Sequence, residues 1–136
     1  MSTQMTINIS TAQGRVLVTI FHIKGQIDIS TYEEFQKHAE QAFKSGVRNL
    51  LLDFSEVSYV ASAGWRSLHY IYKLFRSESA DESDEAVQKG LRDGTYKALH
   101  LKILNPKPEV FDVLKMTGFD MYIDVFYDLK EAVDAF

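Results

Sequence analysis

The chain has 136 residues, of which 46% are hydrophobic and 12% aromatic, so it can bury the core of one folded domain and leaves little room for a second. Its net charge of −4 and its lack of a basic block argue against a protein that binds nucleic acid or an anionic membrane. The absence of cysteine excludes disulfides, thiolate metal sites and cysteine nucleophiles, and no apolar run approaches the roughly 18 residues that span a bilayer. Because residues 1–10 show no signal-peptide pattern, we expect a soluble cytoplasmic domain.

Two strands and a helix are predicted in the first third of the chain. Apolar and polar residues alternate over residues 5–10, and the hydrophobic run 16–23 predicts a second strand, antiparallel to the first across a short turn. Gly25 is expected to end this second strand. Ser30 or Thr31, with a glutamate three residues later, is typical of a capping box and predicts the start of a helix.

Strands and helices alternate through the rest of the chain. Residues 47–54 predict a central strand covered on both faces, and apolar residues at helical spacing predict a helix over 65–75. Residues 77–97 are polar and charged, which predicts a long surface insertion with one short helix. The remaining predicted elements are a strand at 99–104, a helix that starts at Asn105 and Pro106, a strand at 121–126, and a helix opened by Asp128 with Glu131. Because strands joined by helical crossovers run parallel, this order predicts an α/β domain with one mixed five-stranded sheet and about four helices.

The stretch YVASAGWRSL, residues 59–68, places a serine where a buried strand gives way to a helix. Ligands and catalytic groups collect at the carboxyl ends of parallel strands, and the free N–H groups of the following helix point towards that end. A phosphate esterified to Ser62 would therefore be well received there. The alternative is that the Ser62 hydroxyl only caps the helix, and position alone does not separate the two interpretations.

A serine hydrolase that uses Ser62 is a third interpretation. The pattern over residues 60–64 lacks the first glycine of the nucleophile elbow G-x-S-x-G. Only His69 and His100 follow the serine, and Asp93, which precedes His100, lies in or beside the charged insertion, so a catalytic triad is disfavoured.

The other titratable residues predict no site. His22 and His38 share no spacing with a carboxylate and are predicted to lie on the surface or at a strand edge. The carboxylates of residues 81–85 lack the spacing and the turn glycine of an EF-hand, which predicts a solvated face. We therefore expect no catalytic, cofactor or metal site.

Three segments resemble the STAS domain family (sulfate transporter and anti-sigma factor antagonist). LLLDFSEVSYVASAG, residues 50–64, looks like the family signature at the junction of a strand and a helix, and KGQIDISTYEEF, residues 24–35, is similar to its Gly-x-(Leu/Ile)-Asp turn. Residues 101–133 resemble the C-terminal part of the family, including its Leu-x-x-x-Gly helix end. Since the resemblance spans nearly the whole chain apart from 77–97, it implies a single STAS-like domain over residues 1–136.

The resemblance implies a bacterial anti-sigma factor antagonist, which is a protein-binding regulator of transcription and not an enzyme. In that family the serine aligned with Ser62 is phosphorylated by an anti-sigma factor that is also a serine kinase, and a serine phosphatase resets the switch. No cofactor is implied. The expected docking face consists of Gly25, Asp28, Ser55, Ser58, Ala61, Ser62, Ala63 and Gly64.

Two features depart from the family pattern. Ala61 stands where the family usually has an aspartate, and residues 77–97 are far longer than the usual connection. Other branches of the family act as unphosphorylated scaffolds or as subunits of lipid-transport complexes. Both remain open alternatives, with the small serine hydrolase as a minor one.

Overall fold

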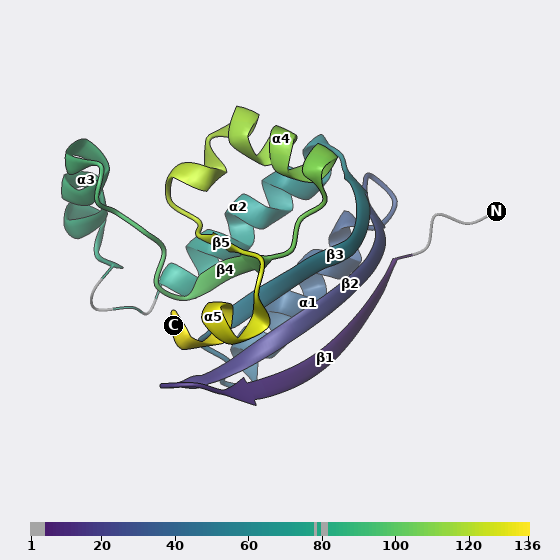
Figure 1. Ribbon diagram of the computed structural model, residues 1–136, viewed down its shortest axis with the longest axis horizontal. Coiled ribbons are helices and arrows are strands. Elements are labelled where there is room, and N and C mark those ends of the chain that lie inside the picture. Colours follow the sequence, from purple (N-terminus) through teal and green to yellow (C-terminus); the bar gives the residue numbers. More distant parts are fainter. Residues whose placement is uncertain (1–4, 78, 80–81) are drawn as a thin grey trace.

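Five strands form one sheet, in the order β1-β2-β3-β4-β5, in the computed structural model, which describes residues 5–77, 79 and 82–136 (Figure 1). β1 is antiparallel to β2, and every later pair of neighbours is parallel. The strands are β1 (Thr6–Gln13), β2 (Leu17–Ile27), β3 (Leu50–Val60), β4 (Leu101–Leu104) and β5 (Val125–Phe126). The described helices are α1 (Tyr32–Lys44), α2 (Ser62–Arg76), α3 (Asp84–Asp93), α4 (Pro108–Thr117) and α5 (Leu129–Asp134), with a 3₁₀ turn, η2 (Phe119–Met121). The predicted mixed α/β sheet is confirmed, and α3 adds a fifth helix inside the insertion.

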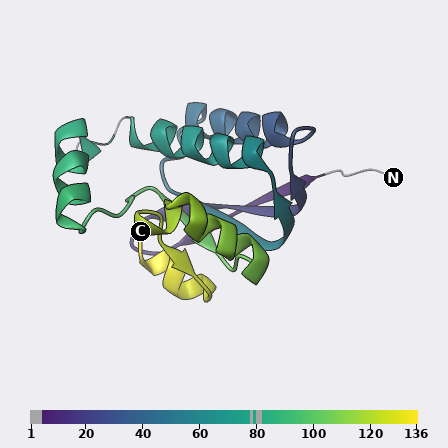
Figure 2. The same cartoon turned by 90° about the horizontal axis from the view of Figure 1, so that it is seen from above.

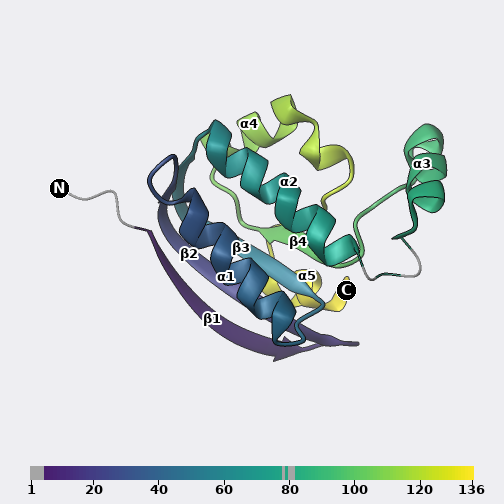
Figure 3. The same ribbon diagram turned by 180° about the vertical axis from the view of Figure 1, so that it is seen from behind.

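Helices cover both faces of the sheet. α1, α2 and α4 pack on one face, where Phe21 and Leu52 of the strands join Phe35 and Leu68 of the helices in the main core. α1 and α2 lie side by side over this face, and α5 lies on the opposite face (Figures 2 and 3). The consecutive leucines at 50–52 are all fully buried because alternate side chains enter the two cores, which confirms the central strand. Within the described ranges, no helix is long and apolar enough to cross a membrane.

β2 and β3 extend further than the sequence predicted. Gly25 was expected to end β2, but the strand continues to Ile27 through two register shifts against β3. Gly25 has a φ of 114°, which glycine adopts without the strain that a Cβ brings. β3 likewise runs to Val60 instead of ending at Phe54. Both strands therefore continue through polar residues, and the end of the apolar run in the sequence did not mark the end of either strand.

The predicted start of α1 is confirmed but its predicted capping bond is not formed, and the predicted start of α4 was wrong. Thr31 is the N-cap of α1 but makes no side-chain cap bond, because its hydroxyl donates to a β2 carbonyl oxygen at 2.7 Å. The predicted capping box is therefore absent from this helix. α4 begins at Pro108, not at Pro106, and its first turn holds the proline where a missing N–H costs nothing. The third start is confirmed, since Asp128 caps α5 by accepting from the Glu131 N–H at 3.0 Å.

The insertion is attached to the domain by buried polar and aromatic groups, although α3 itself stands apart from the sheet (Figure 1). Glu82, predicted to be solvated, is only 3% exposed. Its carboxylate accepts hydrogen bonds from the Tyr96 hydroxyl and, at 3.4 Å, from the Leu99 N–H. The Tyr96 hydroxyl also lies 2.6 Å from that of Tyr72 on α2, and both rings contact Tyr122. These contacts compensate for the cost of burying the carboxylate.

A close approach of two backbones fixes the junction between β3 and α2. The Ala61 N–H donates to the Ile27 carbonyl oxygen at 2.8 Å. A Cβ on Gly64 would lie 2.8 Å from that same oxygen and 2.7 Å from Cγ1 of Val60. Only glycine therefore fits, and the first turn of α2 is held against the end of β2.

Substitution of Gly64 tests this packing. Gly64→Ala should lower the free energy of unfolding by about 1–3 kcal/mol, because the added methyl group overpacks the junction. In an unobstructed helix the same change stabilises by roughly 1 kcal/mol, so the sign is diagnostic. Urea denaturation followed by circular dichroism measures it, with Ser62→Ala in the same turn as the control, expected within about 0.5 kcal/mol of wild type. A Gly64→Ala variant more stable than wild type would show that the junction is not closely packed.

Alkaline titration tests the attachment of the insertion. Burial raises the pKa of Tyr122 to about 12. Burial, together with the hydrogen bonds to Glu82 and Tyr72, also raises the pKa of Tyr96. Because these folded-state values exceed the ordinary phenol pKa of about 10, their contribution to stability is complete below that pH and is lost as the pH rises through the folded values.

The phenolate absorbance of the native protein should therefore show a late-ionising fraction of its seven tyrosines, and Tyr122→Phe should remove part of it. The unfolding free energy should fall between about pH 10 and pH 12. If all seven tyrosines ionised together near the ordinary value, the buried cluster would be disproved.

Candidate functional site

Ser62 is the first residue of α2, and Ala61 is its N-cap. The methyl side chain of Ala61 accepts no hydrogen bond, and α2 has no side-chain cap, so the interpretation of Ser62 as the cap is wrong. Ser62 is exposed, and its hydroxyl has no hydrogen-bond partner among the described residues. It therefore lies free at the end of the helix that carries unpaired N–H groups and positive dipole charge.

The ends of β2 and β3 bring most of the predicted docking residues together. Ile27 pairs with Val60, so Asp28 on one strand end lies beside the 61–64 junction on the other. One step earlier, Ser58 Oγ donates to the Gly25 carbonyl oxygen at 3.4 Å. The members gathered at this edge are Gly25, Asp28, Ser58, Ala61 and Ser62, together with Ala63 and Gly64, whose own atoms are buried. We call this set the junction surface.

Ser55 does not lie with the others. It stands within β3, five residues before the strand ends at Val60, which at roughly 3.3 Å per residue is about 17 Å away. Its N–H donates to Oδ1 of Asp53 at 3.0 Å. The predicted strand end at Phe54 had placed Ser55 at the edge of the sheet.

The Asp28 carboxylate is held within its own turn. Its Oδ1 accepts from the Ser30 hydroxyl at 2.7 Å and from the Ser30 N–H at 2.9 Å, and the Asp28 N–H donates to the Thr31 hydroxyl oxygen at 2.9 Å. The Ser30 hydroxyl contributes most to a pKa of Asp28 below the ordinary carboxyl value. Asp28 is thus a fixed negative charge beside the junction at neutral pH.

Two large apolar side chains are exposed beside the junction surface. Ile29, in the turn after β2, is 74% exposed, and Tyr59, near the end of β3, is 53% exposed. A single exposed apolar residue is ordinary on a protein surface. Two of them flanking a small-residue patch suit a surface that packs against another protein.

Ser10, His22 and Asp53 form a Ser–His–Asp chain on the face of the sheet that carries α5, and the sequence did not predict it. Ser10 Oγ lies 2.8 Å from Nε2 of His22, and Nδ1 of His22 lies 2.8 Å from Oδ2 of Asp53. His22, which shares no sequence spacing with a carboxylate, therefore meets one through the pairing of β2 with β3. Each residue comes from a different strand, β1, β2 and β3, so only knowledge of the strand register could have found the set.

The order of these three groups matches a nucleophile, a base and an orienting acid. A hydrolase also needs N–H groups aimed at the developing oxyanion. The N–H groups of β1 and β2 lie in the plane of the sheet, whereas the three side chains project from its face, so these N–H groups are not aimed at a reacting atom beside Ser10. We therefore interpret the chain as a cross-strand polar network that joins β1, β2 and β3.

Comparison with known proteins identifies the family. A model of the STAS domain matches residues 9–81, which is more than half of the chain. No curated protein matches the sequence.

Solved structures share the fold at low sequence identity. An anti-sigma factor antagonist from Mycobacterium paratuberculosis has a TM-score of 0.71 and 17% identity, over 97% of this chain and 93% of that one. The anti-sigma factor antagonist SpoIIAA in its unphosphorylated form has a TM-score of 0.67 and 15% identity, over 95% and 94%. The Bacillus cell fate determinant SpoIIAA in its phosphorylated form has a TM-score of 0.60 and 17% identity, over 95% and 97%. With the family model, the mixed sheet and the strand–helix junction in agreement, the chain belongs to the STAS domain family.

Proposed function

We propose that this protein is an anti-sigma factor antagonist in a bacterial partner-switching pathway that regulates transcription. Its junction surface docks an anti-sigma factor with serine kinase activity, phosphorylation of Ser62 releases that partner, and a serine phosphatase restores binding. The observation that supports this most is the free, exposed Ser62 hydroxyl at an uncapped helix N-terminus. The fold neighbours, which include an antagonist solved in phosphorylated and unphosphorylated forms, support it further.

The surroundings of Ser62 favour a phosphate in the free protein. Phosphorylation adds about −1.5 to −2 charges, which the N-terminal N–H groups and dipole of α2 stabilise by roughly 0.3–1 kcal/mol. Arg66 lies one turn further along the same helix, is exposed, and has no ion pair among the described residues. Its guanidinium is therefore at the spacing that pairs with a charged group four residues earlier.

The same charge opposes a complex. A docked partner would remove the phosphate from water, and without a cation from the partner this costs several times the stabilisation gained in the free protein. Asp28, a fixed negative charge beside the junction, repels the phosphate more strongly in a docked state that excludes water than in the free protein, where water and salt screen the two charges. The unmodified surface, with Ile29 and Tyr59 exposed, carries no such penalty.

The kinase reaction and the binding assay test the switch together. Incubation with the cognate kinase and ATP should add one phosphate by intact mass spectrometry, and Ser62→Ala should abolish it. Ser62→Ala should still bind the partner, whereas Ser62→Glu should bind at least about tenfold more weakly because of its charge. Thr95→Glu, an exposed position in the insertion, adds the same charge elsewhere and should bind normally.

The contrary outcomes separate the alternatives. Phosphate that still appears in Ser62→Ala would place the modification elsewhere. If this protein binds its partner, gains no phosphate and binds equally well as Ser62→Glu, it is an unphosphorylated scaffold. Recovery of transporter subunits from the native lysate, with no kinase, would indicate the lipid-transport branch.

Replacing the N-cap tests how much the open helix end contributes. Ala61→Asn and Ala61→Asp should each raise the free energy of unfolding by about 0.5–2 kcal/mol, because both side chains accept from the first-turn N–H groups. They should differ in the phosphorylated protein, where the aspartate repels the phosphate and the asparagine does not. Urea denaturation of each form, with and without phosphate, measures this; equal stability of both variants in the phosphorylated state would exclude a phosphate at this end of α2.

A further inference from the structure

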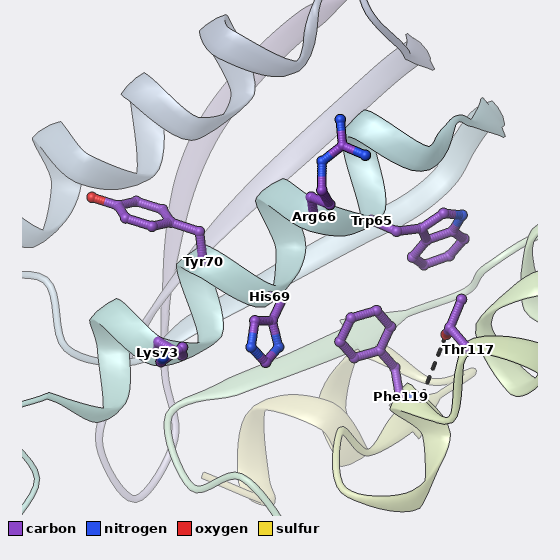
Figure 4. Close-up of a pocket in the computed structure, with 7 residues that line it drawn as sticks. All are labelled: Trp65, Arg66, His69, Tyr70, Lys73, Thr117 and Phe119. Carbon is purple, nitrogen blue, oxygen red and sulfur yellow. Dashed lines mark hydrogen bonds between the residues drawn. The ribbon is translucent and has the colours of Figure 1, made fainter.

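A hollow of about 510 Å³ opens beside the middle of α2, against the chain that follows α4 (Figure 4). Its aromatic wall is formed by Trp65, His69 and Phe119, with Thr117 at one end and the cations Arg66 and Lys73 on its rim. The volume lies within the range of roughly 300–1,000 Å³ that small-molecule sites occupy. None of these side chains belongs to the junction surface.

The wall is rigid and mostly apolar. Trp65 and Phe119 are only 7% and 8% exposed, and their rings stack with centroids 6.1 Å apart and planes inclined by 26°. The His69 ring contacts Phe119 at a centroid distance of 6.1 Å. In Figure 4 these three rings lie in a row, with Phe119 between His69 and Trp65, so an apolar body placed against them would contact aromatic carbon along one wall.

The charged side chains that line the hollow have one sign, and the Glu40 carboxylate outside the lining accepts a hydrogen bond from Tyr70, which lines it. Arg66 and Lys73 line it, no carboxylate does, and neither cation forms an ion pair among the described residues. This is unusual in a chain with a net charge of −4. Burial and the nearby Lys73 lower the pKa of His69, so the ring stays neutral at pH 7 and adds a polar edge to the wall.

We propose that this hollow, the α2 groove, binds a small anionic amphipathic molecule. The apolar body of this molecule packs against Trp65 and Phe119. Its carboxylate stays at the solvent-exposed rim, near Arg66 and Lys73. The positive rim selects an anion, and the aromatic wall supplies most of the buried area. A helix of a partner protein, about 10 Å wide, is too large for a hollow of this volume, which favours a small ligand.

The only tryptophan of the chain lines the groove and reports its occupancy. Decanoate, titrated below its micelle concentration, should change the Trp65 fluorescence saturably. Decyltrimethylammonium, with a chain of the same length and the opposite charge, should bind at least about threefold more weakly. The double substitution Arg66→Gln/Lys73→Gln should weaken decanoate binding roughly three- to tenfold, as expected for two exposed charge contacts.

A matched control removes one arginine and one lysine elsewhere. Lys89→Gln/Arg92→Gln, on the outlying helix α3, should leave decanoate binding unchanged. The proposal is overturned by any of three results: no saturable change with decanoate, equal binding of the cationic surfactant, or equal loss in both double variants. An acidic amphipathic peptide that perturbs Trp65 where decanoate does not would instead make the groove a protein-docking site. Because Ser62→Ala should bind decanoate as wild type does, this test is independent of the phosphorylation switch.

Discussion

The parallel pairing of β2 with β3 determines the rest of the molecule. Both strands have eleven residues, and the first half of each is largely buried on two faces, one under α1 and α2 and the other under α5. Because they run in the same direction, their carboxyl ends meet at one edge, where the turn at Asp28 lies against the junction at Ala61. The hydrogen bond from the Ala61 N–H to the Ile27 carbonyl oxygen and the absence of a Cβ at Gly64 then fix where α2 begins. The position of Ser62 is thus fixed by backbone contacts, and the small side chains of the junction allow the two backbones to approach.

One helix carries three separate features along its length. The first turn of α2 has free N–H groups beside Ser62. The middle of the helix presents Trp65 and His69 to the groove, and its last turns contact the insertion through Tyr72 and Arg76. The buried face between them, including Leu68 and other apolar side chains, packs on the main core. Since α2 is one continuous helix, a structural change at Ser62 would reach the groove or the insertion by shifting the helix on the sheet.

Much of the fold follows from the hydrophobic pattern, and the start of α2 was predicted within one residue of Ser62. The run of three leucines identified the central strand, and the order of strands and helices gave the mixed sheet. The pattern failed where backbone irregularity or tertiary partners decide the outcome. The register shifts near Gly25 let polar residues remain in β2, so composition did not mark its end.

Contacts between residues far apart in the sequence were also not predicted. Ser10, His22 and Asp53 meet only because three strands adopt one particular register, which a single sequence does not encode locally. Glu82 lies in a polar stretch of sequence but is buried, because the Tyr96 hydroxyl and the Leu99 N–H satisfy its carboxylate. Both cases depend on pairings across the fold and not on the spacing of residues along it.

The lengths of the strands imply a gradient of local unfolding across the sheet. β2 and β3 have eleven residues each, whereas β4 has four and β5 only two. Few ladder hydrogen bonds protect the last two strands, so their amide protons should exchange through small openings of the C-terminal segment, while those of β2 and β3 should exchange only when the whole domain unfolds. The proposed docking edge is therefore built on the two longest strands, and small openings of β4 and β5 need not displace it.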